Sequence, residues 1–340
     1  MHRSELTIDL GAIRRNVRTL LRVLDGAELW AVVKADGYGH GATDVAGAAL
    51  GAGATALCVA TVPEALALRR EFTGVRILVM SPVSASREIA HARDADIELA
   101  VSHDEIPDGV RVHLKLDTGM GRYGLGELPE RGGLVVGLMT HLATADSDEA
   151  FARTQLERFL AATGELANLT RHAANSAASL RLPEARLDAA RCGVAIYGLS
   201  PFNTDPADDG LEPALSWQSH LAQVKLLRAG DSTGYGRRYI AERDTWIGLV
   251  PVGYADGFRR DMTGAVVRVA GEPRRAIGTV SMDSFAVELD RELPVGAPVV
   301  LLGHGVLAED HARVADTINY EILCGVRSDA RRTRRTVLDG

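Results

Sequence analysis

The first 200 residues carry eight short apolar segments, most of them separated by enough chain for a helix. The segments are residues 29–34, 56–61, 75–80, 97–102, 110–117, 134–142, 169–175 and 190–198. Val, Ile, Leu and Ala follow one another in them with little polar alternation, which is typical of parallel strands buried on both faces. Eight such strands with helices between them predict an α/β fold, a (β/α)8 barrel of the TIM type.

Helix signals support this alternation. Apolar residues recur at helical spacing before the first segment, at Ile13, Val17, Leu20, Leu21 and Leu24. After the second segment, Thr61, Pro63 and Glu64 form the pattern of a capping box with proline in the first turn. One connection is short, because only residues 103–109 separate the fourth and fifth segments, and a crossover helix hardly fits there. Either one strand is wrongly assigned or one barrel helix is truncated.

The pattern changes near Leu211. Strand-like segments separated by Gly, Pro and Asp turns then follow, at residues 215–227, 245–255, 265–271, 274–282, 284–290 and 297–303. We therefore predict a barrel domain over residues 1–210 and a mainly β domain over residues 211–340, with helical periodicity only around residues 308–323. Residues 5–10 either pair with the β domain or lead into the first helix, and both possibilities stay open. The arginine-rich tail, residues 327–336, is expected to be a solvated end.

Composition narrows the class of protein. Hydrophobic residues make up 46% and charged residues 24%, which is typical of a globular chain. The net charge of −7, without a long basic run before the tail, argues against nucleic acid as a partner. The sequence has no N-terminal apolar stretch and no run long enough to span a bilayer, and its three cysteines show no disulfide or zinc spacing. A cytoplasmic protein without a metal or membrane association is expected.

Polar side chains gather where the predicted barrel strands end. They are Lys34, Lys115, Asp117, His141, Asn175, Ser176 and Arg191, with Gly193 close to Arg191 in the last segment. Catalytic groups of such barrels lie at the carboxyl ends of the strands, so several different strands would direct these groups to one mouth. Each residue alone is more often a surface or structural residue, and their agreement in position is what indicates a site.

Lys34 has the sharpest context. The apolar segment before it would bury its stem, which favours a neutral amine nucleophile able to bond covalently to a carbonyl cofactor. The glycines at 37, 39 and 41 permit close approach of the backbone, and Tyr38 offers a hydroxyl nearby.

The segment AVVKADGYGHG resembles the pyridoxal-phosphate lysine motif of alanine racemases. The resemblance continues in family order over nearly the whole chain, through HLKLDTGMGRYG, THLATAD, HAANSAASL, RCGVAIYGLSP, GYGRRY, PVGYADGFRR, GTVSMD and INYEILCG. It implies a barrel followed by a β domain, a homodimer with shared active sites, and conversion between L-alanine and D-alanine that supplies D-alanine for peptidoglycan.

The resemblance also implies residue roles. Lys34 would bind pyridoxal 5'-phosphate covalently and serve as one base. Arg191 would contact the pyridine nitrogen, and Arg122 would brace the cofactor hydroxyl and the substrate carboxylate. Lys115 would be a carbamylated lysine that steadies Arg122, and His141 would lie between Arg191 and the catalytic tyrosine. The phosphate would be held by Tyr38, Ser176, Gly193, Val194 and Tyr320.

The partner subunit would supply the second base, Tyr235, together with Tyr254, Met282 and Asp283 at the access path and the substrate carboxylate. Tyrosine ionises only near pH 10 in water, so a link from His141 to Arg191 would have to help it act as a base.

Other functions fit parts of the pattern. A racemase of broader specificity, acting on serine, lysine or arginine, would share the catalytic set and differ in the access path. A fold-related amino-acid decarboxylase fits GYGRRY and GTVSMD poorly. A non-catalytic pyridoxal-phosphate carrier shares a barrel and a lysine but lacks a β domain, so the residues from Leu211 onward argue against it.

Overall fold

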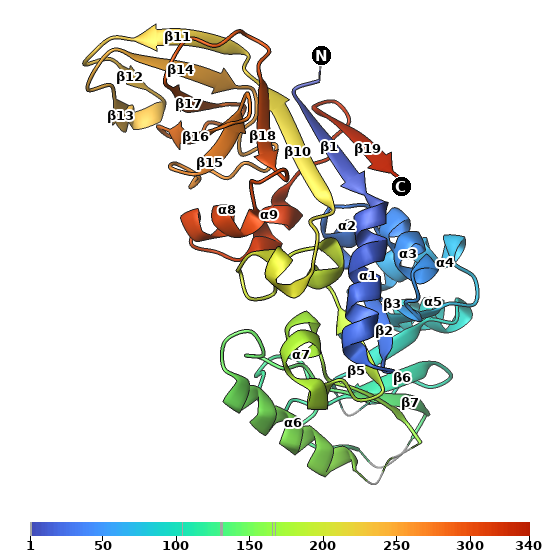
Figure 1. Ribbon diagram of the computed structural model, residues 1–340. Helices are drawn as coiled ribbons and strands as arrows, with labels where there is room; N and C mark the ends of the chain where they lie inside the picture. Colours follow the sequence, from blue (N-terminus) through green and yellow to red (C-terminus); the bar gives the residue numbers. More distant parts are fainter. Residues whose placement is uncertain (1, 104, 130–131, 165, 167) are drawn as a thin grey trace. The chain divides into compact units, whose positions relative to one another are not determined.

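The computed structural model describes residues 2–103, 105–129, 132–164, 166 and 168–340, which form two compact units (Figure 1). The barrel unit comprises Ala12–Phe202 and Ala207–Glu212. The β unit comprises the chain up to Gly11, Asn203–Pro206 and Pro213–Gly340. The described helices include none with both the length and the apolar character that crossing a membrane requires.

All eight predicted barrel segments form strands within the described residues. They are β2 (Glu28–Val32), β3 (Ala56–Val59), β4 (Arg76–Val79), β5 (Glu98–Val101), β6 (Arg111–Lys115), β7 (Leu134–Met139), β8 (Thr170–His172) and β9 (Ala189–Cys192). Every neighbouring pair is parallel, in the order β8-β7-β6-β5-β4-β3-β2-β9. The amides of Asp188 and Arg191 donate to the carbonyls of Arg171 (3.1 Å) and Ala174 (3.0 Å), so hydrogen bonds also link the two ends of the sheet. The predicted barrel is confirmed.

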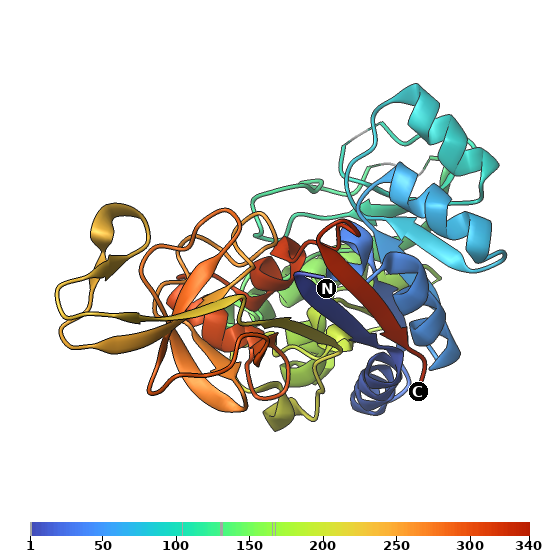
Figure 2. The same cartoon turned by 90° about the horizontal axis from the view of Figure 1, so that it is seen from above.

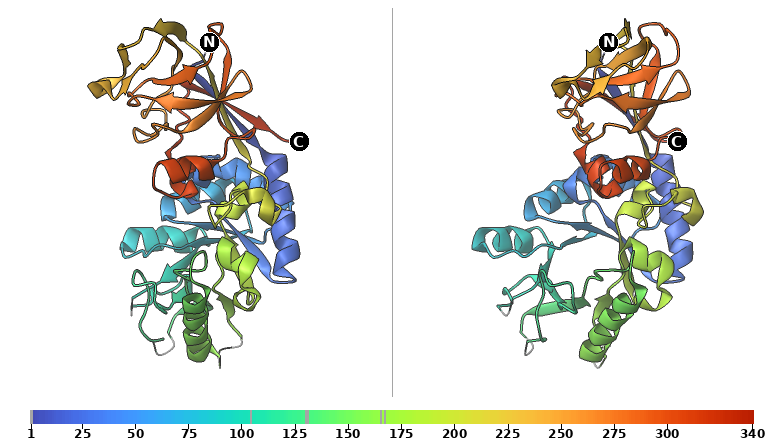
Figure 3. Two further views of the ribbon diagram at one scale, coloured as in Figure 1. Left: turned by 60° about the vertical axis from the view of Figure 1, so that its left-hand side comes forward. Right: turned by 90° about the vertical axis from the view of Figure 1, so that its left-hand side faces the viewer.

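Helices cover the outside of these strands, as Figure 3 shows in blue to green. They are α1 (Leu10–Leu24), α3 (Ala42–Gly51), α4 (Val62–Glu71), α5 (Ser86–Asp94), α6 (Glu149–Thr163) and α7 (Ser176–Arg181), with the 3-10 turn η1 (Pro183–Ala185). The short elements α2 (Lys34–Tyr38) and η2 (Val194–Tyr197) instead follow the carboxyl ends of β2 and β9. The predicted apolar face of α1 is buried at Ile13, Val17 and Leu20. The predicted capping box is present, with Thr61 and Glu64 bonded reciprocally at the start of α4.

The short connection is explained by a missing helix. Both β5 and β6 are present, and the described residues between them contain no helix. Of the two alternatives that the sequence left open, the truncated helix is therefore correct. The described part of the link from β6 to β7 also lacks a helix, and this link carries Arg122.

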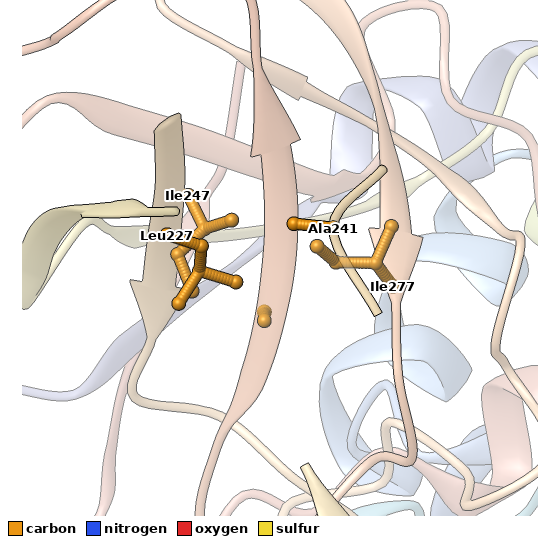
Figure 4. Close-up of a cluster of buried hydrophobic side chains, with 5 residues drawn as sticks. Leu227, Ala241, Ile247 and Ile277 are labelled. Carbon is orange, nitrogen blue, oxygen red and sulfur yellow. The ribbon is translucent and has the colours of Figure 1, made fainter. Parts of the chain in front are cut away.

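The second unit is mainly β, as predicted. Its large sheet has the order β11-β14-β17-β16-β15-β18-β10-β1-β19. The strands are β1 (Ser4–Asp9), β10 (Leu215–His220), β11 (Gln223–Leu227), β14 (Thr245–Val250), β15 (Val266–Val269), β16 (Glu272–Ile277), β17 (Phe285–Leu289), β18 (Pro298–Leu302) and β19 (Thr333–Leu338). A small pair, β12 (Ser232–Thr233) and β13 (Tyr239–Ile240), extends from it. Leu227, Ala241, Ile247 and Ile277 form a buried cluster between these strands (Figure 4).

The helical periodicity predicted for residues 308–323 corresponds to two short helices, α8 (Ala308–Val314) and α9 (Asn319–Gly325). The segment from Ser4 to Asp9 both pairs with the β unit and leads into the first helix, which were the two possibilities left open for it. It pairs as β1 with β10 and β19, and α1 begins at the next residue.

Most residues of the predicted solvated end, 327–336, are exposed, but the end also contains a strand that was not predicted. Residues 333–338 form β19, which runs parallel to β1 at the edge of the sheet (Figure 2). A buried contact between the hydroxyls of Ser4 and Thr333 (2.9 Å) joins the two strands, and Arg334 pairs with Glu5 (2.7 Å). The exposed arginines suit an edge strand, because charged side chains there oppose further strand pairing. Charge therefore identified the exposure of this end but not its strand.

Candidate active site

The predicted polar residues of the barrel do lie at the carboxyl ends of its strands. Lys34 follows β2, Lys115 ends β6, and His141 follows β7. Ser176 follows β8, while Arg191 belongs to β9. Electrostatic interactions connect them, because Lys34, Arg122 and Arg191 all lower the pKa values of Lys115 and His141. These residues, which are far apart in the sequence, therefore lie together at one mouth of the barrel.

Lys34 opens a left-handed turn. The φ angles of Ala35, Asp36, Gly37 and Tyr38 are 53°, 51°, 61° and 53°. Non-glycine residues in this region cost roughly 1–2 kcal/mol each, and such strain persists only where the surroundings hold it. Here the Asp36 carboxylate accepts from the amide of Ala42 (2.9 Å), and the Ala35 amide donates to Glu64 (2.8 Å). The turn is therefore an enforced feature that sets the position from which Lys34 projects.

A small cradle of donors lies beside this turn. The Ser176 hydroxyl accepts from the amides of Gly193 (3.0 Å) and Ala195 (3.4 Å) at the start of η2. A Cβ atom on Gly193 would lie 2.6 Å from the hydroxyl of Tyr38, so only glycine permits this approach. Amides and hydroxyls that converge at the first turn of a helix attract anions, phosphate above all.

Arg191 is a buried cation, 3% exposed. Its Nη1 donates to the carbonyl (2.8 Å) and to the Nδ1 (2.6 Å) of His172. Its Nη2 donates to the carbonyls of Thr140 (2.7 Å) and Ala173 (3.2 Å). Among the described residues no carboxylate forms a direct ion pair with this guanidinium, and burial lowers the pKa of Arg191 to about 10. It therefore stays protonated at neutral pH, held by neutral acceptors.

His141 is a neutral neighbour of this cation. Burial, reinforced by Arg191, lowers the pKa of His141 to about 3. Its Nδ1 lies 3.5 Å from Nη2 of Arg191 and accepts, because a guanidinium can only donate. The single ring proton is then on Nε2, which leaves His141 with a donor for another group.

Lys115 and Arg122 belong to one closed loop. The Asp117 carboxylate accepts from the amides of Gly119 (3.0 Å), Met120 (2.8 Å) and Gly121 (3.1 Å), which fixes the chain just before Arg122. The amide of Leu125 donates back to the carbonyl of Lys115 (2.7 Å). Burial, with the charges of Arg122 and Arg191, lowers the pKa of Lys115 to about 8. A substantial share of this amine is therefore neutral in mildly alkaline solution.

The remaining predicted residues belong to the β unit. Tyr235 begins the 3-10 turn η4 (Tyr235–Arg237), and its carbonyl accepts from the hydroxyl of Thr279 (3.0 Å). The residue is 68% exposed. The backbone is thus anchored while the phenol projects outward. Tyr320 lies on α9 and is half-buried.

Tyr254 and Met282 lie on adjoining turns, because the amides of Tyr254 and Ala255 donate to the carbonyls of Ser281 (3.1 Å) and Met282 (3.0 Å). Asp283 is already engaged. Its carboxylate pairs with Arg332 (2.7 Å), whose hydrogen bond lowers the pKa of Asp283. The side chain of Asp283 therefore anchors its turn, and the structure places no free negative charge there.

Sequence reasoning missed several residues that shape this site. Glu64 was interpreted only as a helix cap, yet it also holds the turn after Lys34. His172 was not selected although it contacts Arg191. The available signal was its place at the head of HAANSAASL, directly before the residues selected there.

The arrangement can perform definite chemistry. It offers an amine on an enforced turn, an anion cradle and a buried cation that donates hydrogen bonds. These groups fit a cofactor with a carbonyl, a phosphate and an aromatic nitrogen, such as pyridoxal 5'-phosphate. Gly193 supports this fit, because the absence of a Cβ lets the Tyr38 hydroxyl lie beside the cradle.

Comparisons with known proteins agree along the whole chain. The family model described as alanine racemase, N-terminal domain, matches residues 8–201, and the one described as alanine racemase, C-terminal domain, matches residues 214–335. Alanine racemase 1 of Bacillus subtilis (strain 168) is 40% identical, over 94% of this chain and 90% of the relative. Alanine racemase of Symbiobacterium thermophilum is 41% identical, over 94% of this chain and 93% of the relative.

Solved structures give the same answer for the fold. The alanine racemase from D-cycloserine-producing Streptomyces lavendulae has a TM-score of 0.91 at 37% identity, over 100% of this chain and 98% of that one. The biosynthetic alanine racemase from Pseudomonas aeruginosa has a TM-score of 0.93 at 34% identity, over 99% of this chain and 100% of that one.

Proposed function

Because the chain belongs to the alanine racemase family, isomerases that interconvert L-alanine and D-alanine, we propose that its barrel binds pyridoxal 5'-phosphate and that two subunits share each active site. The family depends on this cofactor, and its general role is to supply D-alanine for peptidoglycan. The convergence of Lys34, the Ser176–Gly193 cradle and the buried Arg191 at one mouth of the barrel carries the proposal. The proposed division of labour is a barrel domain within residues 1–210 that holds the cofactor, and a β domain of residues 211–340 together with β1 that completes the partner's site.

Several residues would hold the cofactor. Lys34 would bind its carbonyl carbon, and Arg191 would donate a hydrogen bond to the ring nitrogen. Arg122 would brace the ring hydroxyl and the substrate carboxylate. The phosphate contacts would come from Tyr38, Ser176, Tyr320 and the backbone of Gly193 and Val194. When bound, pyridoxal phosphate supplies the electron sink that makes the Cα proton of an amino acid removable.

The chain's own residues would then move that proton. Lys34, once its amine is released, would take or return it on one face of the substrate. Tyr235 of the partner subunit would do so on the other face. His141 accepts from Arg191 at Nδ1 and therefore has an Nε2–H to donate to the Tyr235 phenolate, which stabilises the charged form of that base.

Tyr254, Met282 and Asp283 of the β unit would line the access path and the substrate carboxylate site. Tyr254 and Met282 are 40% and 53% exposed in the single chain, as a surface that completes another subunit's site requires. Since the Asp283 carboxylate is paired with Arg332, we expect this turn to act through its shape and backbone donors rather than through that charge.

Subunit mixing tests the proposal. Neither Lys34→Ala nor Tyr235→Ala alone should racemise alanine, but mixing them lets hybrid dimers form one complete site each. Equal mixing would restore about a quarter of the wild-type sites, because half the dimers are hybrids and each has one native site of two. The readout is alanine racemisation with added pyridoxal phosphate, after mass spectrometry has confirmed subunit exchange. Continued inactivity after confirmed exchange would contradict a shared site.

A further inference from the structure

Four buried side chains form a continuous chain of hydrogen bonds through the barrel core. Glu98 on β5 bonds His113 on β6, with 2.8 Å between Oε2 and Nε2. His113 bonds His172 on β8, with 2.9 Å between Nδ1 and Nε2. His172 bonds Arg191 on β9, with 2.6 Å between Nδ1 and Nη1. None of the four is more than 3% exposed, so water does not compete for these contacts.

The two ends of this chain determine its direction. A guanidinium can only donate, so Nδ1 of His172 accepts and its proton is on Nε2. That proton is donated to Nδ1 of His113, whose own proton is then on Nε2. From there it is donated to Glu98, and an ionised carboxylate can only accept. Both imidazoles are therefore neutral Nε2–H tautomers, and burial lowers the pKa values of both.

The residues around these four side chains hold them in place. A Cβ atom on Gly137 of β7 would lie 2.0 Å from Nδ1 of His113, so glycine makes room for that ring. Trp30 packs against the rings of His113 and His172, at centroid distances of 5.6 and 4.5 Å. Glu98 is kept ionised although burial opposes it, because hydrogen bonds from His113 and Arg111 and the charge of Arg76 lower its pKa.

We propose that Glu98 is a positioning residue for racemisation, which acts through His113 and His172 to hold Arg191 in the orientation that the cofactor requires. This inference rests on the proposed role of Arg191 at the ring nitrogen. The physical basis is that an ionised Glu98 prevents the four side chains from donating their hydrogen bonds in the opposite direction. In that direction Nδ1 of His172 would carry a proton and face the Arg191 donor at 2.6 Å, so the contact would break. A buried carboxylate sets the tautomer of the catalytic histidine in serine proteases by the same logic.

Glu98→Gln is the informative variant. In Glu98→Gln the oxygen that accepts from Arg111 leaves an NH2 group facing Nε2 of His113, so this end of the chain favours the reversed direction while Arg191 still favours the original one. We expect ring-15N NMR of histidine-labelled holoenzyme to show only Nε2–H tautomers at His113 and His172 in the unsubstituted protein, and a mixture in Glu98→Gln. We expect kcat for alanine to fall about tenfold, as is usual when a partner of a site residue is removed, with little change in KM.

Glu28→Gln is the matched control. Glu28 also faces Arg76 (3.7 Å) and accepts from Nε1 of Trp30 (2.7 Å), but it is outside the chain of four. It should leave the tautomers and kcat at wild-type values. Glu98→Asp, which can still only accept, should keep the Nε2–H tautomers and serves if Glu98→Gln does not fold.

An Nδ1–H or doubly protonated ring at His113 or His172 in the unsubstituted holoenzyme near neutral pH would overturn the proposal. So would wild-type kcat in Glu98→Gln with mixed tautomers. Failure of the proposed function would look different, since wild-type protein would not racemise alanine while its histidine tautomers stayed as described.

Discussion

At the scale of single residues, Glu64 shows how one carboxylate serves two elements. Its Oε2 accepts from the amides of Ala60 (2.8 Å) and Thr61 (3.0 Å) before α4, while Oε1 accepts from Ala35, the residue after Lys34. The capping box was visible in the sequence because its members are three residues apart. The contact with Ala35 was not, because 29 residues separate the partners and nothing local indicates it.

Glu64→Gln separates these two functions. A glutamine has one acceptor oxygen where the carboxylate has two, so it cannot serve the helix cap and Ala35 together. We expect kcat to fall about tenfold because the left-handed turn loses its restraint, an effect of about 1.4 kcal/mol on the barrier. Steady-state kinetics of the cofactor-loaded enzyme, with thermal unfolding in parallel, measure this.

Thr61→Val is the control, because it removes only the other half of the capping box. It should cost about 1 kcal/mol of stability and leave kcat unchanged. If Glu64→Gln behaves like Thr61→Val, Glu64 is a helix cap and nothing more.

Lys115 makes a second prediction at this scale. The chain has three lysines, Lys34, Lys115 and Lys225, and the pKa of Lys115 is lowered to about 8. Between pH 7 and pH 9 its neutral fraction should rise from about a tenth to about nine tenths, following from that pKa. The neutral amine can add CO2, forming an N–C bond with loss of one proton. The resulting anion would lie among Arg122 and Arg191, where a cation is disfavoured.

We therefore expect a carbamate carbon signal from the protein in 13C-labelled CO2, stronger at pH 9 than at pH 7 at equal dissolved CO2. Lys115→Arg should abolish the signal, whereas replacing the exposed Lys225 by Arg should not. A signal that persists in Lys115→Arg would assign the carbamate elsewhere.

At the scale of elements, the strands were predictable and several of their long-range pairings were not. The segment around Leu29–Lys34 and its seven counterparts identify themselves by uninterrupted apolar character, which a doubly buried strand requires. The pairing of β1 with β19 joins residues more than 320 positions apart, as Ser4 and Thr333 show. β19 has the sequence TRRTVL, with two arginines among its six residues and its apolar residues only at the end, so neither apolar pattern nor alternation marks it as a strand. Its place depends on partners that local sequence does not encode.

Asp256 connects such a long-range element to the proposed access path. Its carboxylate, in a residue 1% exposed, accepts from the Gly253 amide (2.9 Å) and from Arg332 just before β19 (2.5 and 3.0 Å). Asp256→Asn keeps the shape but removes the charge, so we expect a loss of about 2 kcal/mol in unfolding free energy. The KM for alanine should rise, because Tyr254 shares this turn.

Denaturant unfolding and kinetics of Asp256→Asn check both effects. Asp261→Asn is the matched control, because Asp261 pairs with Arg259 on the surface (2.6 Å) and exposed pairs contribute little. An unchanged KM together with reduced stability would remove this turn from the proposed substrate site.

At the scale of the whole molecule, the question is whether the residues of one active site come from one subunit or from two. The barrel unit holds Lys34 and the proposed cofactor cradle, while the β unit presents Tyr235, a residue 68% exposed. A base that works on a water-sensitive carbanion needs a surface that closes over it. The sequence places the two proposed bases in different predicted domains, and only the family resemblance indicates which subunit supplies each one.

Adding an excess of inactive subunits to wild-type protein tests whether each active site needs residues from two subunits. In a hybrid of wild type with Lys34→Ala, the wild-type barrel meets the native Tyr235 of its partner, so each wild-type subunit keeps one working site. In a hybrid with the double variant Lys34→Ala and Tyr235→Ala, the wild-type barrel meets an alanine and the native tyrosine meets a barrel without its lysine. Both active sites of this hybrid are then inactive. Wild type held at fixed concentration should keep its activity as Lys34→Ala is added, and lose it progressively as the double variant is added. If each subunit instead carried a complete site, neither variant would change the rate, because the wild-type subunit would need nothing from its partner.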